Sequence, residues 1–171
     1  EREPMQMGKV IQNAIPGALI SVGSDRGCFT AALFPKKFDR LIQIDASPEV
    51  CRYNQITRAI RGGTDGDLEL ALELLNTKDF GQWKNLASSG NGHWLFALNN
   101  QYFDWWQNVR ALNKVETDPS RRGKPIEGDF LSESETFKYL SQLVQSDRNH
   151  VKMLSLGEET EMFMGILNHI K

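Results

Sequence analysis

The sequence lacks the residue patterns that identify most metal and hydrolase sites. Its three histidines, His93, His150 and His169, are far apart, and neither an H-x-x-x-H nor a C-x-x-C pair occurs. There is no G-x-S-x-G nucleophile turn and no G-x-x-x-x-G-K-[ST] phosphate loop. The sequence therefore gives no support for a metalloenzyme, a serine hydrolase or a P-loop nucleotidase, and we predict no metal ligand.

The chain also has little net charge, little cysteine and no long hydrophobic run. A formal charge of −2 gives no general attraction to nucleic acid or to an anionic membrane, so nucleic acid is not an expected partner. No segment is long enough to span a bilayer, and no signal peptide is visible. Cys28 and Cys51 are read as small buried hydrophobes in a reducing compartment, which predicts a cytoplasmic protein.

Two short apolar runs near the N-terminus predict neighbouring strands. Ala18–Val22 and Leu41–Ile44 are four or five residues long and end in turns rich in small or acidic residues, which is typical of buried strands. Phe29–Phe34 between them predicts a short crossover helix, and Pro48 opens a second helix. The order strand, helix, strand, helix predicts a βαβα unit with parallel strands in an α/β fold.

The turns that end these two strands contain the residues that could bind a ligand. Gly23 and Gly27 flank the first turn, where glycine permits positive φ and lets a ligand approach the backbone. The helix that follows presents unpaired N–H groups. Asp45 ends the second strand about 20 residues later, where a carboxylate can bind ribose hydroxyls. This spacing favours a nucleoside site; the alternative is that both turns merely connect elements.

The stretches ISVGSDRG and LIQIDASPEV resemble the first two motifs of class I S-adenosylmethionine-dependent methyltransferases. Gly23 and Gly27 match the first and third glycines of that family's first motif, and Asp45 matches its ribose-binding acid. Ser21 stands in place of the motif's acidic residue and Asp25 in place of its middle glycine. A G-x-G-x-x-G fingerprint for nicotinamide cofactors fits less well. A nicotinamide enzyme remains an alternative, which binding of NAD would reveal.

The resemblance implies S-adenosylmethionine as cofactor and a Rossmann-like parallel sheet with strand order 3-2-1-4. It places a third strand at 125–131 and a fourth at 151–156. Near the end of the third strand, Asp129 is the candidate for the adenine amino group. The residues assigned to cofactor binding are Gly23, Ser24, Asp25, Gly27, Asp45, Ala46, Ser47, Asp129 and Phe130. Since the family sheet has further strands, we expect another chain or a further segment to cover the edge of the fourth strand.

The middle of the chain departs from the resembled fold. Residues 1–60 and 125–171 supply the Rossmann-like domain, and 61–124 form a helical insertion with a dense aromatic series. Aromatic residues at helical spacing are usually core. The functional alternative is an acceptor pocket or lid.

The resemblance implies an S-adenosylmethionine-dependent transferase, most simply a methyltransferase on an unidentified acceptor. An aminocarboxypropyl transferase is an alternative, because a long helical insertion after strand two also occurs in such relatives. Another is a non-catalytic module that binds a partner through its aromatic insertion. Ser155-Leu156-Gly157-Glu158 replaces the Asn-Pro-Pro-aromatic motif of base amino methyltransferases. No residue is assigned a catalytic role, because transfer from a sulfonium depends chiefly on alignment and desolvation.

Overall fold

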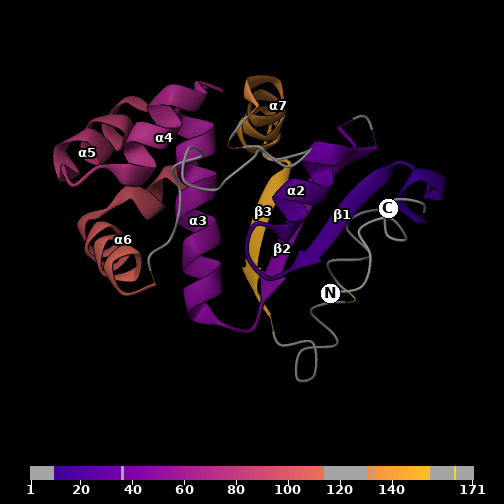
Figure 1. Ribbon diagram of the computed structural model, residues 1–171, viewed down its shortest axis with the longest axis horizontal. Coiled ribbons are helices and arrows are strands. Elements are labelled where there is room, and N and C mark those ends of the chain that lie inside the picture. Colours follow the sequence, from indigo (N-terminus) through magenta and orange to yellow (C-terminus); the bar gives the residue numbers. More distant parts are fainter. Residues whose placement is uncertain (1–9, 36, 114–130, 132, 155–163, 165–171) are drawn as a thin grey trace.

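A computed structural model of the protein describes residues 10–35, 37–113, 131, 133–154 and 164, without the side chains of 110–113. The architecture is α/β, with a parallel three-stranded sheet and a group of helices (Figure 1). The strands are β1 (Gly17–Val22), β2 (Phe38–Asp45) and β3 (Asn149–Met153). The helices are α2 (Arg26–Leu33), α3 (Pro48–Gly63), α4 (Leu68–Asn76), α5 (Phe80–Ser89), the 3₁₀ helix η1 (His93–Leu98), α6 (Asn100–Asn113) and α7 (Ser134–Gln145).

The strands follow each other across the sheet in the order β1-β2-β3, and both pairs are parallel. Val22 lies opposite Ile44, and Asp45 lies opposite Met153, so all three strands end at the same edge. The α/β class and the parallel pairing of the first two strands are confirmed. The predicted order 3-2-1-4 is wrong for the strand expected at 151–156, which pairs with β2 rather than β1.

The position of β3 beside β2 has a physical cause at the start of the strand. The N–H of Leu41 donates to the carbonyl of Arg148 at 2.8 Å, and the Asn149 side chain donates to the Leu41 carbonyl at 3.2 Å. Successive strands are also usually neighbours in a sheet. The strand predicted at 125–131 lies outside the described residues apart from Leu131, which is in a turn. That something covers the edge of the fourth strand stays a prediction.

Helix α3 is the longest described helix and lies between the sheet and helices α4, α5 and α6 (Figure 1). Ser47 caps it by accepting a hydrogen bond from the Val50 N–H, and Pro48 occupies the first turn as expected. The helix continues through Gly62 and Gly63, which lie within the range 61–124 assigned to the insertion. A Cβ at Gly62 would lie 2.6 Å from a methyl carbon of Val144, so this glycine allows α7 to pack closely.

One hydrophobic core includes residues from all three sequence ranges, 1–60, 61–124 and 125–171. The aromatic residues of the middle range are mostly part of it, as Trp83 and Trp106 are 0% exposed. Their indole N–H groups donate to the carbonyls of Leu74 and Leu75 at 3.0 and 2.9 Å. The interpretation of this aromatic series as core is therefore confirmed for these side chains.

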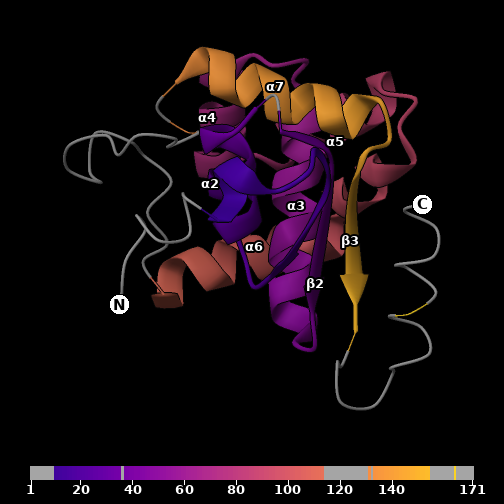
Figure 2. The same ribbon diagram turned by 90° about the vertical axis from the view of Figure 1, so that its right-hand side faces the viewer.

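The two faces of the sheet have different surroundings. Figure 2 shows the described helices on one side of the strands, with α7 across the edge where the strands begin. Leu41 belongs to the core beneath these helices, whereas Ile42 and Ile44 belong to a separate apolar cluster. Within the part of the chain described here, no helix is both long enough and apolar enough to cross a membrane.

Candidate functional site

The turn after β1 has the conformation that its glycine predicts. Gly23 has φ of +96°, a region that residues with a Cβ avoid, and a Cβ placed there would meet no atom within 4 Å. Its N–H donates to the carbonyl of Ile44 at 3.4 Å. The backbone therefore bends at Gly23 while it still borders β2, and one side of the bend is open.

Buried side chains from β2 and α3 fix the carbonyl groups of this turn. The Asn54 amide donates to the Gly23 carbonyl at 2.9 Å, and the Gln43 amide donates to the Ser24 carbonyl at 3.1 Å. Both donors are 0% exposed, so water does not compete for them. These contacts hold the turn from beneath and leave Ser24 exposed.

Asp25, which stands at the middle glycine of the resembled motif, has its side chain directed toward α3. Its backbone is right-handed, with φ of −75° and ψ of −1°, so no left-handed geometry is needed here. Its Oδ2 accepts a hydrogen bond from the Tyr53 hydroxyl at 2.6 Å. Asp25 and Tyr53 also line, with Arg61, an internal cavity of about 10 Å³, which is about the size of one water molecule.

Gly27 has a packing role. It is buried in the first turn of α2, and a Cβ there would lie 2.7 Å from the Cβ of Ser21 and 3.0 Å from a methyl carbon of Leu41. Such distances are too short for packed carbon atoms, so a side chain would push α2 away from the sheet. The pairing of Gly27 with the small Ser21 lets the helix approach β1 closely.

Asp45 ends β2 between the tips of the other two strands. Its Oδ1 accepts the N–H of Ser47 at 2.8 Å, which shapes the turn into α3, while Ala46 is exposed. Its other carboxylate oxygen has no hydrogen bond with a described residue. The sheet therefore brings the turn 23–27 and the turn 45–47 to one edge. Asp129 and Phe130, the remaining predicted site residues, lie outside the described residues.

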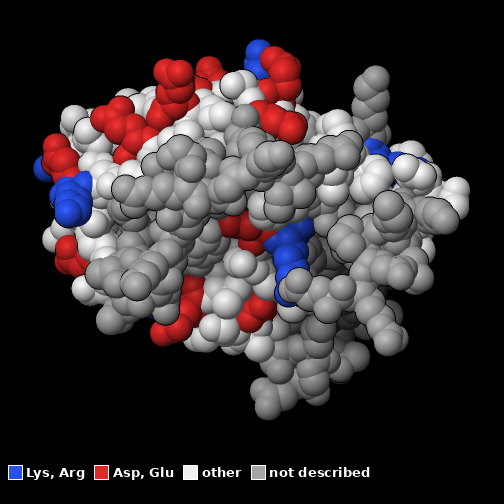
Figure 3. Space-filling view, viewed as in Figure 1, with Lys and Arg blue, Asp and Glu red and all other residues white. Residues whose placement is uncertain are grey.

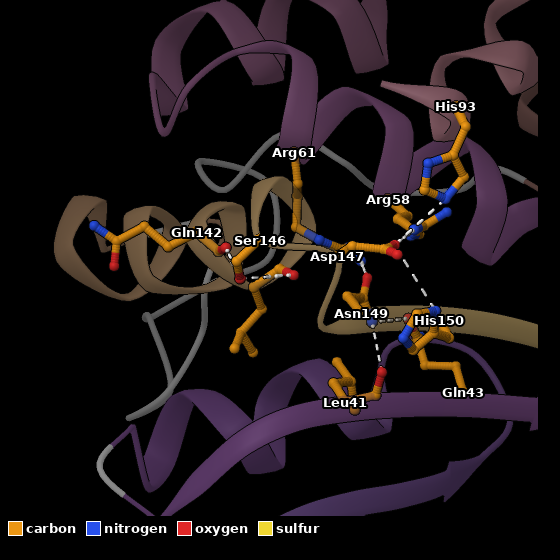
Figure 4. Close-up of polar contacts among 11 residues, drawn as sticks. Leu41, Gln43, Arg58, Arg61, His93, Gln142, Ser146, Asp147, Asn149 and His150 are labelled. Atoms are coloured by element: carbon orange, nitrogen blue, oxygen red, sulfur yellow. Dashed lines mark hydrogen bonds and ion pairs between the residues drawn. The ribbon is translucent and has the colours of Figure 1, made fainter. Parts of the chain in front are cut away.

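A buried polar network beneath the turn was missed at the level of sequence. Arg61 donates to Asn149 at 3.4 Å, and Asn149 donates to Gln43 at 3.4 Å (Figure 4). The Gln43 amide in turn donates to the Ser24 carbonyl. Arg61 and Asn149 are 2% and 1% exposed. The only available signal was a glutamine inside the apolar run Leu41–Ile44, because buried polar groups require partners.

A second charged cluster joins the insertion to the turn before β3. Asp147, at φ of +55°, lies 3.4 Å from the Arg58 guanidinium and 3.3 Å from His93 (Figure 4). Burial lowers the pKa of Arg58 to about 10, against the opposing effect of Asp147. His150 Nδ1 lies 3.9 Å from the same carboxylate, and burial lowers the pKa of its imidazole.

The cysteines do not form a reactive site. Burial raises the pKa of Cys28 to about 12 and also raises that of Cys51, so both thiols stay protonated at neutral pH. Both are free and buried, as expected. Among the described side chains, no group of three or more His, Cys, Asp or Glu is arranged to hold a metal ion.

Acidic side chains gather over α4 and α7 on the face drawn in Figure 3. Glu69 and Glu73 on α4 and Glu135 on α7 are exposed.

Comparison with known proteins does not assign the chain to a family. No model of a known protein family matches the chain, and no curated protein shows significant similarity to it.

Proposed function

We propose that the protein is an S-adenosylmethionine-dependent transferase, most simply a methyltransferase, with its cofactor at the edge formed by residues 23–27 and 45–47. The observation that carries the proposal is the parallel pairing of Val22 with Ile44, which puts Gly23 beside Asp45. A glycine bend and a carboxylate at adjacent strand ends are the arrangement that binds a nucleoside at the carboxyl edge of a parallel sheet.

The described residues are compatible with such a cofactor. Asp45 has one carboxylate oxygen engaged by Ser47 and the other available for a ribose hydroxyl. Gly23 leaves open space where the backbone would approach the ligand. Asp25 is held by Tyr53, so its side chain is drawn toward α3 rather than left free over the turn. The amide groups at the start of α2 add partial positive charge at the same edge.

When bound, S-adenosylmethionine supplies a sulfonium whose carbon substituent is transferred to a nucleophile. In this proposal the chain's residues bind and orient rather than exchange protons. Asp45 fixes the ribose, and the turn at Gly23 fixes the backbone that borders it. Gln43 and Asn54 keep the turn from moving through their bonds to its carbonyl oxygens. The gain in rate comes from alignment of the reacting atoms.

Calorimetric titration with S-adenosylmethionine and S-adenosylhomocysteine tests the proposal. We expect Asp45→Asn to weaken binding at least tenfold, because the variant keeps an oxygen for the Ser47 N–H but loses the charge that strengthens a hydrogen bond to ribose. Asp104→Asn, which neutralises an exposed carboxylate of α6, is the matched control and should bind as the unaltered protein does. Absence of binding by the folded unaltered protein would refute the proposal.

The products separate the two transferase reactions. Methyl transfer leaves S-adenosylhomocysteine, whereas transfer of the aminocarboxypropyl chain leaves 5′-methylthioadenosine. The helical insertion between β2 and β3 is the feature that keeps the second reaction under consideration. Chromatography of the adenosine product formed by the protein with a candidate acceptor would assign the reaction.

A non-catalytic binding module is the second candidate, and one residue favours it. Phe96 on η1 is 54% exposed, although the other described aromatic side chains of the insertion are buried or half-buried. It lines a shallow hollow of about 360 Å³ together with His93 and Leu95. Exposed aromatic residues are common at protein interfaces. This candidate predicts a folded protein that binds neither adenosine compound and loses a protein partner on Phe96→Ser.

A further inference from the structure

A second hollow lies at the edge of the sheet opposite Gly23 and Asp45. It has a volume of about 410 Å³ and is bordered by the starts of β1 and β2 and by the last turns of α7. Figure 2 shows α7 crossing this edge, at the far end of the strands from the β3 arrowhead. The volume falls in the range of roughly 300–1,000 Å³ that is typical of small-molecule sites.

The hollow is already formed, and apolar side chains contribute part of its lining. Phe38 and Leu143, which line it, are 8% and 5% exposed. The Tyr139 hydroxyl donates to the Phe38 carbonyl at 2.6 Å, which joins α7 to β2. The Gly17 N–H donates to the Lys37 carbonyl at 3.0 Å, which joins β1 to the segment before β2. Hydrogen bonds between separate elements therefore hold its walls in place without a ligand.

The rim of the hollow carries a cation, Arg148, whose head group has no partner among the residues that the structure describes. The backbone of Arg148 is fixed on both sides, since its N–H donates to Leu143 at 2.7 Å and its carbonyl accepts from Leu41 at 2.8 Å. Its guanidinium makes no hydrogen bond or ion pair with any residue that the structure describes. A guanidinium on a fixed backbone is suited to bidentate binding of a carboxylate.

Two further charges on the rim define what else a ligand must carry. Lys37 adds a second cation, whose ammonium also donates to the Gln12 carbonyl at 2.8 Å. Asp39 adds an exposed carboxylate. Burial and the nearby Asp39 raise the pKa of Tyr139 to about 12, so its hydroxyl stays neutral and adds no negative charge. The last carbonyls of α7 also favour a positive group.

We propose that this hollow binds a small amino acid with an apolar side chain. Arg148 and Lys37 bind its carboxylate, Asp39 binds its ammonium, and its side chain packs on Phe38 and Leu143. The proposal concerns a site separate from the cofactor edge and does not depend on the transferase assignment.

Three probes that share the isobutyl side chain of leucine test this chemistry. L-Leucine has the carboxylate, the ammonium and the apolar part, 4-methylpentanoate lacks the ammonium, and 3-methylbutylamine lacks the carboxylate. In amide NMR titrations without cofactor, we expect L-leucine to shift the signals of Gly17, Lys37, Asp39 and Arg148. The affinity should fall at least fivefold for 4-methylpentanoate, and the amine should not bind. No shift at these amides with L-leucine, or equal affinity for all three probes, would overturn the proposal.

Variants locate the binding within the hollow. Arg148→Gln should weaken L-leucine binding at least tenfold, and Arg148→Lys should restore part of it. Gly17→Leu should block the hollow without loss of charge, because a Cβ at Gly17 meets no atom within 4 Å and the strand should still form. Lys84→Gln removes an exposed cation of α5 and is the control, which should bind normally. Unchanged affinity in folded Arg148→Gln and Gly17→Leu would contradict the proposed site.

Discussion

The side-chain nitrogen of Gln43 lies 3.1 Å from the carbonyl oxygen of Ser24, so the middle of β2 holds the turn that follows β1. Gln43 is 0% exposed and also accepts a hydrogen bond from Asn149. Gln43→Met keeps the length of the side chain but removes both bonds. We expect faster amide hydrogen exchange in residues 24–27, a loss of stability of about 1–3 kcal/mol, and about tenfold weaker binding of S-adenosylhomocysteine.

Ser141→Ala is the matched control for Gln43→Met. Ser141 is 1% exposed, and its hydroxyl donates to the Arg61 carbonyl at 2.6 Å, so it is also a buried polar group, but it does not contact the turn. The control should lose stability while exchange in residues 24–27 and ligand affinity stay unchanged. Equal effects of both substitutions on the turn would mean that Gln43 acts only through general stability.

The two glycines of the turn should respond differently to alanine. Gly23→Ala imposes a Cβ on a backbone with φ of +96°, which costs roughly 1–2 kcal/mol although the space is open. Gly27→Ala meets Ser21 at 2.7 Å, and this overpacking costs about 1–3 kcal/mol. Adding Ser21→Gly to each variant distinguishes backbone strain from overpacking when stability is measured by urea unfolding. Ser21→Gly should recover stability in Gly27→Ala and should give no such recovery in Gly23→Ala.

Tyr53→Phe isolates the hydroxyl that binds Asp25. The ring contact with Trp106, with centroids 5.5 Å apart, survives in the variant, while the 2.6 Å bond to the carboxylate is lost. A hydrogen bond to a charged group contributes about 1.5–3 kcal/mol, so thermal unfolding should show a loss of that order. Tyr102→Phe, which loses a hydroxyl bond to Gln55 on the neighbouring face of α3, provides a comparison without contact to the turn. An unaffected melting temperature in Tyr53→Phe would contradict the assigned bond.

Local sequence signals were sufficient to predict those elements whose boundaries are set by a few neighbouring residues. The apolar runs predicted β1 and β2, and Pro48 predicted the start of α3, where the Ser47 side chain accepts the Val50 N–H at 3.4 Å. Glycine was ambiguous, because the same residue allows a turn and allows close packing. Gly23 is a turn glycine, whereas Gly62 lies inside α3 against α7.

Relationships between distant segments were beyond local signals. The spacing of residues in the sequence does not indicate that Asn149 forms hydrogen bonds with Leu41 and Gln43, which precede it by more than 100 residues. These contacts nevertheless help to place β3 beside β2 in the sheet. The candidate site was predictable at its two turns because both lie within 30 residues. The polar side chains that hold the first turn come from β2 and α3. Their contacts depend on how these elements pack, so they could not be predicted from the sequence.

Acidification should destabilise the protein through His150. Burial lowers the pKa of this imidazole below its ordinary value of 6.5; Arg58, Arg40 and Lys152 act in the same direction, and Asp147 opposes them. The unfolded chain therefore binds a proton at higher pH than the folded chain does. The stability that a neutral His150 allows is complete above about pH 6.5 and falls as the pH drops below this value. Urea unfolding between pH 7.5 and pH 5 should show this decline, and His150→Gln should reduce it.

His93→Gln is the matched control for this prediction, because His93 contacts the same Asp147 carboxylate while its side chain is 67% exposed. The side chain of His150 is 29% exposed, so only His150 is substantially removed from water. The desolvation argument requires a smaller pH-dependent change in His93→Gln than in His150→Gln. An equally steep decline in the unaltered protein and in His150→Gln would contradict the prediction.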